Sequence, residues 1–74
     1  MMKLSEVAPG TTVRIVGFEK EEDALKLMEM GCLPGETVTM AFIAPLGDPV
    51  SIIVTGYQLS LRLEEAEKVQ VESL

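Results

Sequence analysis

A helical pattern ends and a strand pattern begins within the segment Met30-Gly31-Cys32-Leu33-Pro34-Gly35-Glu36-Thr37-Val38, and the other elements are expected to pack around this junction. Gly31 follows an amphipathic run and can adopt the left-handed conformation that ends a helix without a Cβ penalty. We therefore predict that Gly31 is the first residue beyond the helix. Cys32 should then pack against Leu27, which is the apolar contact of a Schellman ending.

Pro34 and Gly35 predict a chain reversal directly after this helix end. Pro34 fixes φ near the value needed at the second position of a turn, and Gly35 supplies the positive φ that a type II turn needs at the third. The same pair occurs as Pro9-Gly10 ahead of Thr11-Thr12-Val13, so one kind of turn is expected to start two strands. Four residues are accordingly assigned structural roles: Gly31, Cys32, Pro34 and Gly35.

The patterns on either side of the junction predict one helix and five short strands. The helix covers about residues 20–30 and has an apolar stripe of Ala24, Leu27 and Met28. A strand at 13–18 precedes it, with Gly17 marking a bulge. Alternation then predicts strands at 37–42 and 50–54, a strand at 57–63, a helical turn near residues 64–67, and a closing strand with Val69 and Val71. In the strand at 37–42, Val38, Met40 and Phe42 are expected to share the buried face.

So many short strands in 74 residues predict a mainly β protein, with residues 1–74 forming one domain. A small antiparallel barrel would hide the sheet edges, and we predict a five-stranded SH3-like barrel with one inserted helix. An OB-fold is the alternative, because it is also a five-stranded barrel with a helix. The helix of an OB-fold usually lies between the third and fourth strands, whereas here it follows the first.

Composition argues against several classes of partner and location. Six basic and twelve acidic residues give a net charge of −6, which disfavours nucleic acid and anionic membrane surfaces. The longest apolar run, residues 40–46, is broken by Pro45 and is too short for membrane insertion. One cysteine, Cys32, cannot close an intramolecular disulfide. These features predict a cytoplasmic location.

The sequence shows no constellation for catalysis. Cys32 lacks the histidine partner that a nucleophile of this kind would use, since the chain contains no histidine. The carboxylates gather at the start of the helix and at Glu64–Glu67, where solvated faces place charge. The glycines are isolated turn residues and form no phosphate-binding loop. We predict that the chain is not an enzyme, requires no cofactor and has no closed Cys/His zinc cage, while the ligands of any metal stay unidentified.

Exposed apolar residues give the clearest signal of an interaction. Leu46 lies in a loop between Pro45 and Pro49, which cannot donate hydrogen bonds to a sheet, and should therefore point outward. Ile53 is a further candidate for such a patch. The predicted partner-binding residues are Leu33, Pro45, Leu46, Gly47, Asp48 and Pro49.

Three segments together resemble the FeoA family, ferrous iron transport protein A: residues 25–35, then Ala44-Pro45-Leu46-Gly47-Asp48-Pro49, then residues 56–66. The resemblance implies a cytosolic SH3-like domain that accompanies FeoB, a membrane ferrous iron transporter with a cytoplasmic GTPase domain. A similar domain forms the C-terminal part of regulators of the diphtheria-toxin-repressor type. The DNA-binding and metal-sensing segments of such a repressor are missing from this sequence, so a free-standing FeoA is the closer likeness.

The resemblance implies a non-enzymatic accessory protein of ferrous iron uptake and iron homeostasis, which docks on the cytoplasmic GTPase part of FeoB and modulates it. The alternative is a transition-metal-ion-binding sensor or oligomeric regulatory module that binds a divalent ion through carboxylates and Cys32. Only the resemblance leaves room for weak binding of iron or zinc. A homo-oligomer stays open, and neither nucleic acid nor direct membrane insertion is expected.

Overall fold

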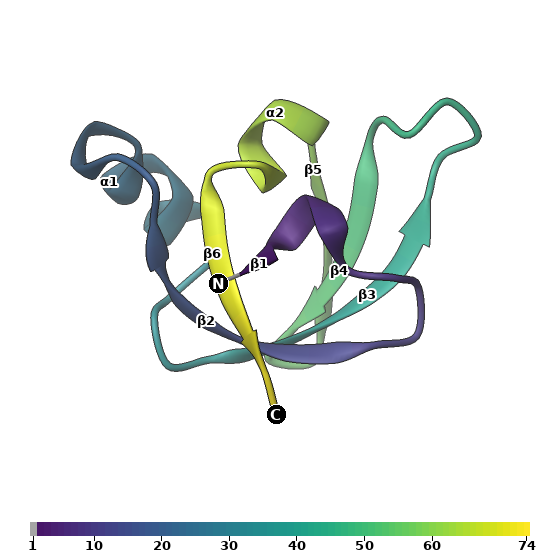
Figure 1. The fold of residues 1–74 in the computed structure, drawn as a ribbon, viewed down its shortest axis with the longest axis horizontal. Coiled ribbons are helices and arrows are strands. Elements are labelled where there is room, and N and C mark those ends of the chain that lie inside the picture. The colour runs from purple at the N-terminus through teal and green to yellow at the C-terminus, as the bar shows by residue number, and fades with distance from the viewer. Residues whose placement is uncertain (1) are drawn as a thin grey trace.

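The computed structural model describes residues 2–74, which form one six-stranded antiparallel sheet and two short α-helices (Figure 1). The elements follow one another as β1 (Met2–Lys3), the 3-10 turn η1 (Leu4–Glu6), β2 (Thr12–Phe18), α1 (Glu21–Met30), β3 (Thr37–Ile43), β4 (Val50–Val54), β5 (Tyr57–Leu61), α2 (Leu63–Ala66) and β6 (Val69–Ser73). The strand order is β1-β6-β2-β3-β4-β5. Figure 1 shows the sheet curled around its core, with α1 at one side and α2 at the top. This mainly β architecture, with α1 inserted after β2, is the predicted one.

The core is aliphatic, as a sequence with three aromatic residues requires. Every strand from β2 to β6 contributes at least one fully buried side chain. The largest fully buried side chains are those of Leu4 in η1 and of Ile15, Met40, Ile52 and Leu61 in the strands. Leu27 and Ala66 close the core from the two helices. Of the stripe predicted on α1, Leu27 is buried, whereas Ala24 and Met28 are half-buried.

The junction after α1 has the predicted Schellman geometry. Gly31 has φ of 117°, and its N–H donates to the carbonyl oxygen of Met28 at 3.0 Å. The N–H of Cys32 donates to the carbonyl oxygen of Leu27, also at 3.0 Å. Cys32 and Leu27 are both buried in the same apolar cluster. These two bonds satisfy carbonyls that a helix end otherwise leaves without partners.

Both Pro-Gly turns are present. The N–H of Glu36 donates to Leu33 across Pro34-Gly35, and the N–H of Thr11 donates to Ala8 across Pro9-Gly10, each at 3.1 Å. The start of α1 differs slightly from the predicted one, because the helix begins at Glu21 rather than near residue 20. The N–H of Glu19 donates instead to the carbonyl oxygen of Lys68 at 2.8 Å, a contact between distant parts of the chain.

Two bulges interrupt the regular pairing of the strands. The first lies between Ile15 and Gly17 in β2, where the sequence predicts it. The second is unpredicted: Met40 pairs with Ile52, but Phe42 pairs with Ser51, so β3 holds one extra residue. An extra residue reverses the direction of the side chains that follow it. The expectation that Phe42 shares the buried face of Val38 and Met40 is therefore wrong, and Phe42 is 57% exposed.

A sixth strand adds to the five that the sequence predicts. Met2 and Lys3 form β1, which pairs with β6 opposite Val71 and Gln70. Two residues are too few to show a strand period, which explains why β1 was not predicted. In the pairing of residues 2–74, β1 and β5 are the two edges of the sheet and are not paired with each other.

Candidate docking surface

The loop between β3 and β4 presents the most exposed large apolar side chain of residues 2–74. Leu46 is 96% exposed at its tip. The loop is closed by its own backbone, since the N–H of Ala44 donates to Pro49 at 3.1 Å and the N–H of Gly47 donates to Ala44 at 2.7 Å. In Figure 1 this loop forms the upper right corner of the molecule. The prediction that Leu46 points outward is confirmed.

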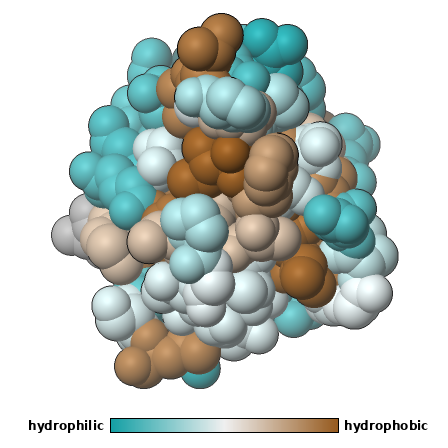
Figure 2. All heavy atoms as spheres, turned by 90° about the vertical axis from the view of Figure 1, so that its right-hand side faces the viewer, coloured by the Kyte–Doolittle hydropathy of each residue, from teal (hydrophilic) through white to brown (hydrophobic). Residues whose placement is uncertain are grey.

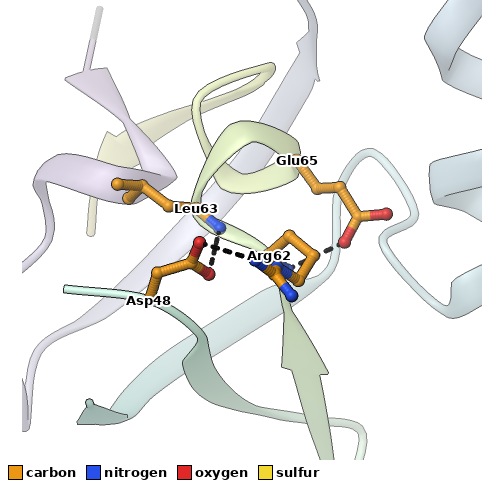
Figure 3. Close-up of polar contacts among 4 residues, drawn as sticks. All are labelled: Asp48, Arg62, Leu63 and Glu65. Atoms are coloured by element: carbon orange, nitrogen blue, oxygen red, sulfur yellow. Dashed lines mark hydrogen bonds and ion pairs between the residues drawn. The ribbon is translucent and has the colours of Figure 1, made fainter. Parts of the chain in front are cut away.

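The side chain of Asp48 points towards Arg62 and Leu63 (Figure 3), whereas Leu46 is exposed. Its Oδ1 accepts a hydrogen bond from the backbone N–H of Leu63 at 2.9 Å, and its Oδ2 accepts one from Nη2 of Arg62 at 3.1 Å. Both donors belong to the entrance of α2. The structure thus gives the carboxylate of Asp48 partners within the chain, and the loop presents Pro45 and Leu46 more openly than Asp48.

The outer face of β3, β4 and β5 continues this surface as a grid of uncharged residues. The cross-strand pairs place Thr39, Ile53 and Gln58 in one row. The next row holds Phe42, Ser51 and Ser60. Phe42 and Ile53 are diagonal neighbours in this grid and are exposed by 57% and 43%. Gln58 Nε2 donates to Ser51 Oγ at 2.8 Å, so the nearly buried hydroxyl of Ser51 has a hydrogen-bond partner.

Charge is nearly absent from this part of the chain. Residues 37–61 carry one charged side chain, that of Asp48, in a protein that has eighteen charged residues in all. Figure 2 looks at the side that carries the β3–β4 loop and shows apolar surface at its centre and at its upper end. We call the exposed residues Phe42, Pro45, Leu46 and Ile53 the uncharged surface. The sequence pointed to three of these residues and missed Phe42, because only the bulge in β3 exposes it.

Leu33 lies apart from the uncharged surface. It is 44% exposed and belongs to the turn that leads into β3, whereas the loop with Leu46 follows the other end of β3. A strand of seven residues separates two points by about 20 Å. The structure therefore does not join Leu33 and the loop into one patch, although the sequence suggested both as partner-binding residues.

A small cavity lies between the two helices. It measures about 60 Å³ and is lined by Asp23, Lys26, Leu27, Glu64, Glu65 and Lys68. Two ion pairs cross it: Lys26 Nζ lies 3.4 Å from Glu65 Oε2, and Lys68 Nζ lies 3.5 Å from Asp23 Oδ1. Sites for small molecules usually measure about 300 Å³ or more. This cavity is better explained as the seam where α1 and α2 meet than as a substrate site.

Cys32 is buried and has the environment of a structural cysteine. Burial, with a further contribution from the negative charge of Glu65, raises the pKa of its thiol to about 11. A thiol with such a pKa stays protonated at neutral pH, so it is neither a strong nucleophile nor a ready metal ligand. Among residues 2–74, no group of three or more His, Cys, Asp and Glu side chains is placed to hold a metal ion. We therefore assign no metal site to these residues.

We expect Cys32 to resist alkylation by iodoacetamide at pH 8 in the folded chain and to react quickly in guanidinium chloride, because only unfolding restores an ordinary thiol.

The raised pKa of Cys32 also stabilises the fold below about pH 9, and this contribution should be lost as the pH rises towards 11. Comparison of Cys32→Ala with the parent chain by denaturation at pH 8 and pH 11 isolates it. An equal loss of stability in both chains would contradict the assignment.

No helix within residues 2–74 has the length and apolar character needed to span a bilayer.

The chain has relatives in known families and structures. A family model described as the FeoA domain matches residues 2–73. The chain is 42% identical over 72 residues to the Fe(2+) transport protein A/Fe(2+) transporter FeoB fusion protein of Porphyromonas gingivalis (strain ATCC BAA-308 / W83). That match covers 96% of this chain and 8% of the fusion protein, so most of the relative's length has no counterpart here.

Solved structures agree with the fold. The FeoA-like protein from Clostridium acetobutylicum has a TM-score of 0.88 and 37% identity, over 100% of this chain and 91% of that one. FeoA of Stenotrophomonas maltophilia, solved with zinc and described as a procaryotic SH3 domain protein, has a TM-score of 0.82 and 30% identity, over 97% of this chain and 91% of that one. The zinc belongs to that protein, and it is consistent with the expectation, implied by the family resemblance, that a divalent metal can bind weakly.

The likeness to metal-dependent regulators concerns the fold alone. IdeR of T. acidophilum aligns with a TM-score of 0.80 at 20% identity, over 99% of this chain and 34% of that one. This agrees with the predicted similarity to one domain of diphtheria-toxin-repressor-type regulators. The family model matches residues 2–73, and several relatives with the same SH3-like fold are at least 30% identical to this chain. The chain therefore belongs to the FeoA family of ferrous iron transport.

Proposed function

We propose that this chain is a non-enzymatic accessory protein that docks on the cytoplasmic GTPase part of a FeoB-type ferrous iron transporter in the cytoplasm and modulates it. The observation that carries the proposal is the uncharged surface, which combines a fully projecting Leu46 with the exposed side chains of Phe42 and Ile53. FeoB is the favoured partner because a relative 42% identical to this chain is named as a fusion with FeoB. Two domains joined in one chain meet at a high effective concentration.

The chemistry of the surface suits association with another protein. Apolar side chains gain free energy when water leaves them, and the absence of charge removes the desolvation penalty that ion pairs would bring. The whole chain has a net charge of −6, and all its charged side chains except Asp48 lie outside residues 37–61. A partner that approaches from the uncharged surface therefore avoids most of the acidic side chains. Leu46 fits a concave apolar pocket, while Phe42 and Ile53 fit a flatter surface.

No chemical step is assigned to the chain itself. Its one thiol is buried and protonated at neutral pH, and the cavity between the helices is crossed by two ion pairs. These features support a role carried by contact rather than by turnover. Modulation of the partner would then arise because the docked chain binds one conformation of the GTPase domain more tightly than another.

Leu46→Asp is expected to weaken binding to the purified cytoplasmic domain of FeoB by at least about tenfold, because the variant would place a charge in an apolar pocket. Isothermal titration calorimetry measures the affinity. The same variant should lose the effect of the chain on the rate of GTP hydrolysis by that domain. Because Leu46 is 96% exposed, the fold should be unaffected, and an NMR spectrum checks this.

Leu25→Asp is the matched control, since Leu25 is an exposed leucine (66%) on α1 and lies outside the uncharged surface. The control variant should bind as the parent chain does. Equal affinity of Leu46→Asp and the parent would remove the loop from the docking surface. Equal loss in Leu25→Asp and Leu46→Asp would show that added charge, rather than the position of the leucine, weakens the complex.

A further inference from the structure

One side chain ties the exposed loop to the rest of the protein. Asp48 lies two residues after Leu46, and its two carboxylate oxygens accept hydrogen bonds from different donors of the α2 entrance (Figure 3). The backbone N–H of Leu63 is 2.9 Å from Oδ1, and Nη2 of Arg62 is 3.1 Å from Oδ2. Two bonds to separate groups fix both the place and the rotation of the carboxylate. The loop is thus held at Asp48.

The point of attachment is itself firmly held. The backbone N–H of Arg62 donates to Glu65 Oε1 at 2.8 Å, which is one of the two hydrogen bonds of a capping box. The other bond needs an acceptor on the N-cap side chain, and an arginine side chain has none. The Oε2 atom of the same glutamate lies 3.4 Å from Lys26 Nζ on α1, and Ala66 at the end of α2 is fully buried. Asp48 therefore joins the loop to a part of the barrel that is anchored in the core.

The rest of the loop has little else to hold it in place. The hydrogen bonds of Ala44 and Gly47 close the loop on itself and do not reach another element. Within residues 2–74, two side-chain hydrogen bonds join the loop of residues 44–49 to another element, and Asp48 accepts both of them. Leu46 is 96% exposed and so gains almost no support from packing. Apart from the base of the loop, where Ile43 pairs with Val50, its attachment to the protein comes from the bonds made by Asp48.

We infer that Asp48 is a positioning residue that holds Leu46 in place for a pocket of the partner. The inference rests on the proposed docking of this chain on FeoB. A side chain that is already in its bound position loses less conformational freedom when the complex forms, and the apparent affinity falls in proportion to the fraction of chains with the correct conformation. Asp48 should therefore strengthen the complex without contacting the partner.

The first test uses the free chain and needs no partner. In Asp48→Ala, ¹⁵N relaxation should show the order parameters of the Leu46 and Gly47 amides falling from about 0.85 to below about 0.6. Asp23→Ala is the matched control: it also removes a partly buried carboxylate from an ion pair, with Lys68, but at the α1–α2 seam. The loop should stay ordered in this control. A loop that remains rigid in Asp48→Ala overturns the inference.

The second test measures association with the purified cytoplasmic domain of FeoB. Asp48→Ala should lower the affinity by about tenfold, mainly through a slower association rate, because fewer free chains present Leu46 correctly. Asp48→Asn keeps an oxygen for the N–H of Leu63 and should recover part of the loss. Arg62→Gln should change the affinity by less than about twofold, since this ion pair is exposed.

The outcomes separate this inference from the proposed function. A parent chain that does not bind FeoB contradicts the proposed function, whereas the relaxation of the free loop still decides whether Asp48 holds it. A loop that becomes mobile in Asp48→Ala with no change in affinity would overturn the positioning role and leave docking intact. If Asp48→Ala does not fold, both the loop relaxation and the affinity are measured on Asp48→Asn. Smaller changes in the same direction are then expected. An Asp48→Asn chain that equals the parent in both measurements would contradict the inference.

Discussion

Gly31→Ala is expected to destabilise the fold by about 3 kcal/mol and to lower the melting temperature by about 15 °C. A Cβ atom on Gly31 would clash with Oη of Tyr57, so the tyrosine side chain or the backbone would have to move. The backbone at this position has φ of 117°, which residues other than glycine rarely adopt. Backbone strain carries most of the cost, because Oη is the far end of a half-exposed tyrosine side chain that can move aside. Differential scanning calorimetry measures the change.

A double variant separates these two causes. Tyr57→Phe alone removes a long hydrogen bond, 3.4 Å from Oη to the carbonyl oxygen of Met30, and should cost about 0.5 kcal/mol. When it is combined with Gly31→Ala, the Oη atom that meets the new Cβ is absent while Cζ remains beside it, so only about 0.5 kcal/mol should be recovered. The backbone strain should remain. Full additivity of the two single changes would show that Tyr57 does not lie over Gly31 in solution.

Ile52→Ala should destabilise the fold by about 3 kcal/mol, because it leaves a cavity in the core. Ile52 is completely buried and pairs with Met40 on one side and Leu59 on the other. Denaturation by urea, with the slope compared between variant and parent, gives the change in the free energy of unfolding.

The adjacent residue provides the control. Ile53 lies on the opposite side of β4 and is 43% exposed, so Ile53→Ala should cost about 1 kcal/mol or less. It should nevertheless weaken the complex with FeoB, because Ile53 belongs to the uncharged surface. The reverse order of the two stabilities would mean that the register of β4 is shifted by one residue and that the uncharged surface is wrongly placed.

Local chemistry accounts for the features that the sequence predicted correctly. The end of α1 at Gly31, the turns at both Pro-Gly pairs and the bulge before Gly17 depend on residues within a few positions of one another. Their conformations follow from φ preferences and nearby hydrogen bonds. Leu46 could be placed at an exposed tip for the same reason, because its neighbours are turn residues.

Features that depend on distant partners were not predictable in this way. Alternation placed Phe42 in the core, but the bulge between Met40 and Phe42 exists only because β4 pairs with β3 in one particular register. Asp48 was expected to face a partner. Its carboxylate instead binds Leu63 and Arg62, which follow it by about fifteen positions and reach it only when α2 packs beside the loop.

The sequence by itself determined where α1 ends, where the two Pro-Gly turns lie and the aliphatic nature of the core, because these depend on residue type and short-range geometry. The predicted strand at 57–63 ends instead at Leu61, because Leu63 begins α2. The tertiary structure alone decided how the exposed apolar residues are arranged. It separated Leu33 from Leu46 by the length of β3, turned Phe42 outward beside Ile53, and gave Asp48 its partners. Strand register and contacts between distant segments set these positions, and neither is encoded in any single stretch of the chain.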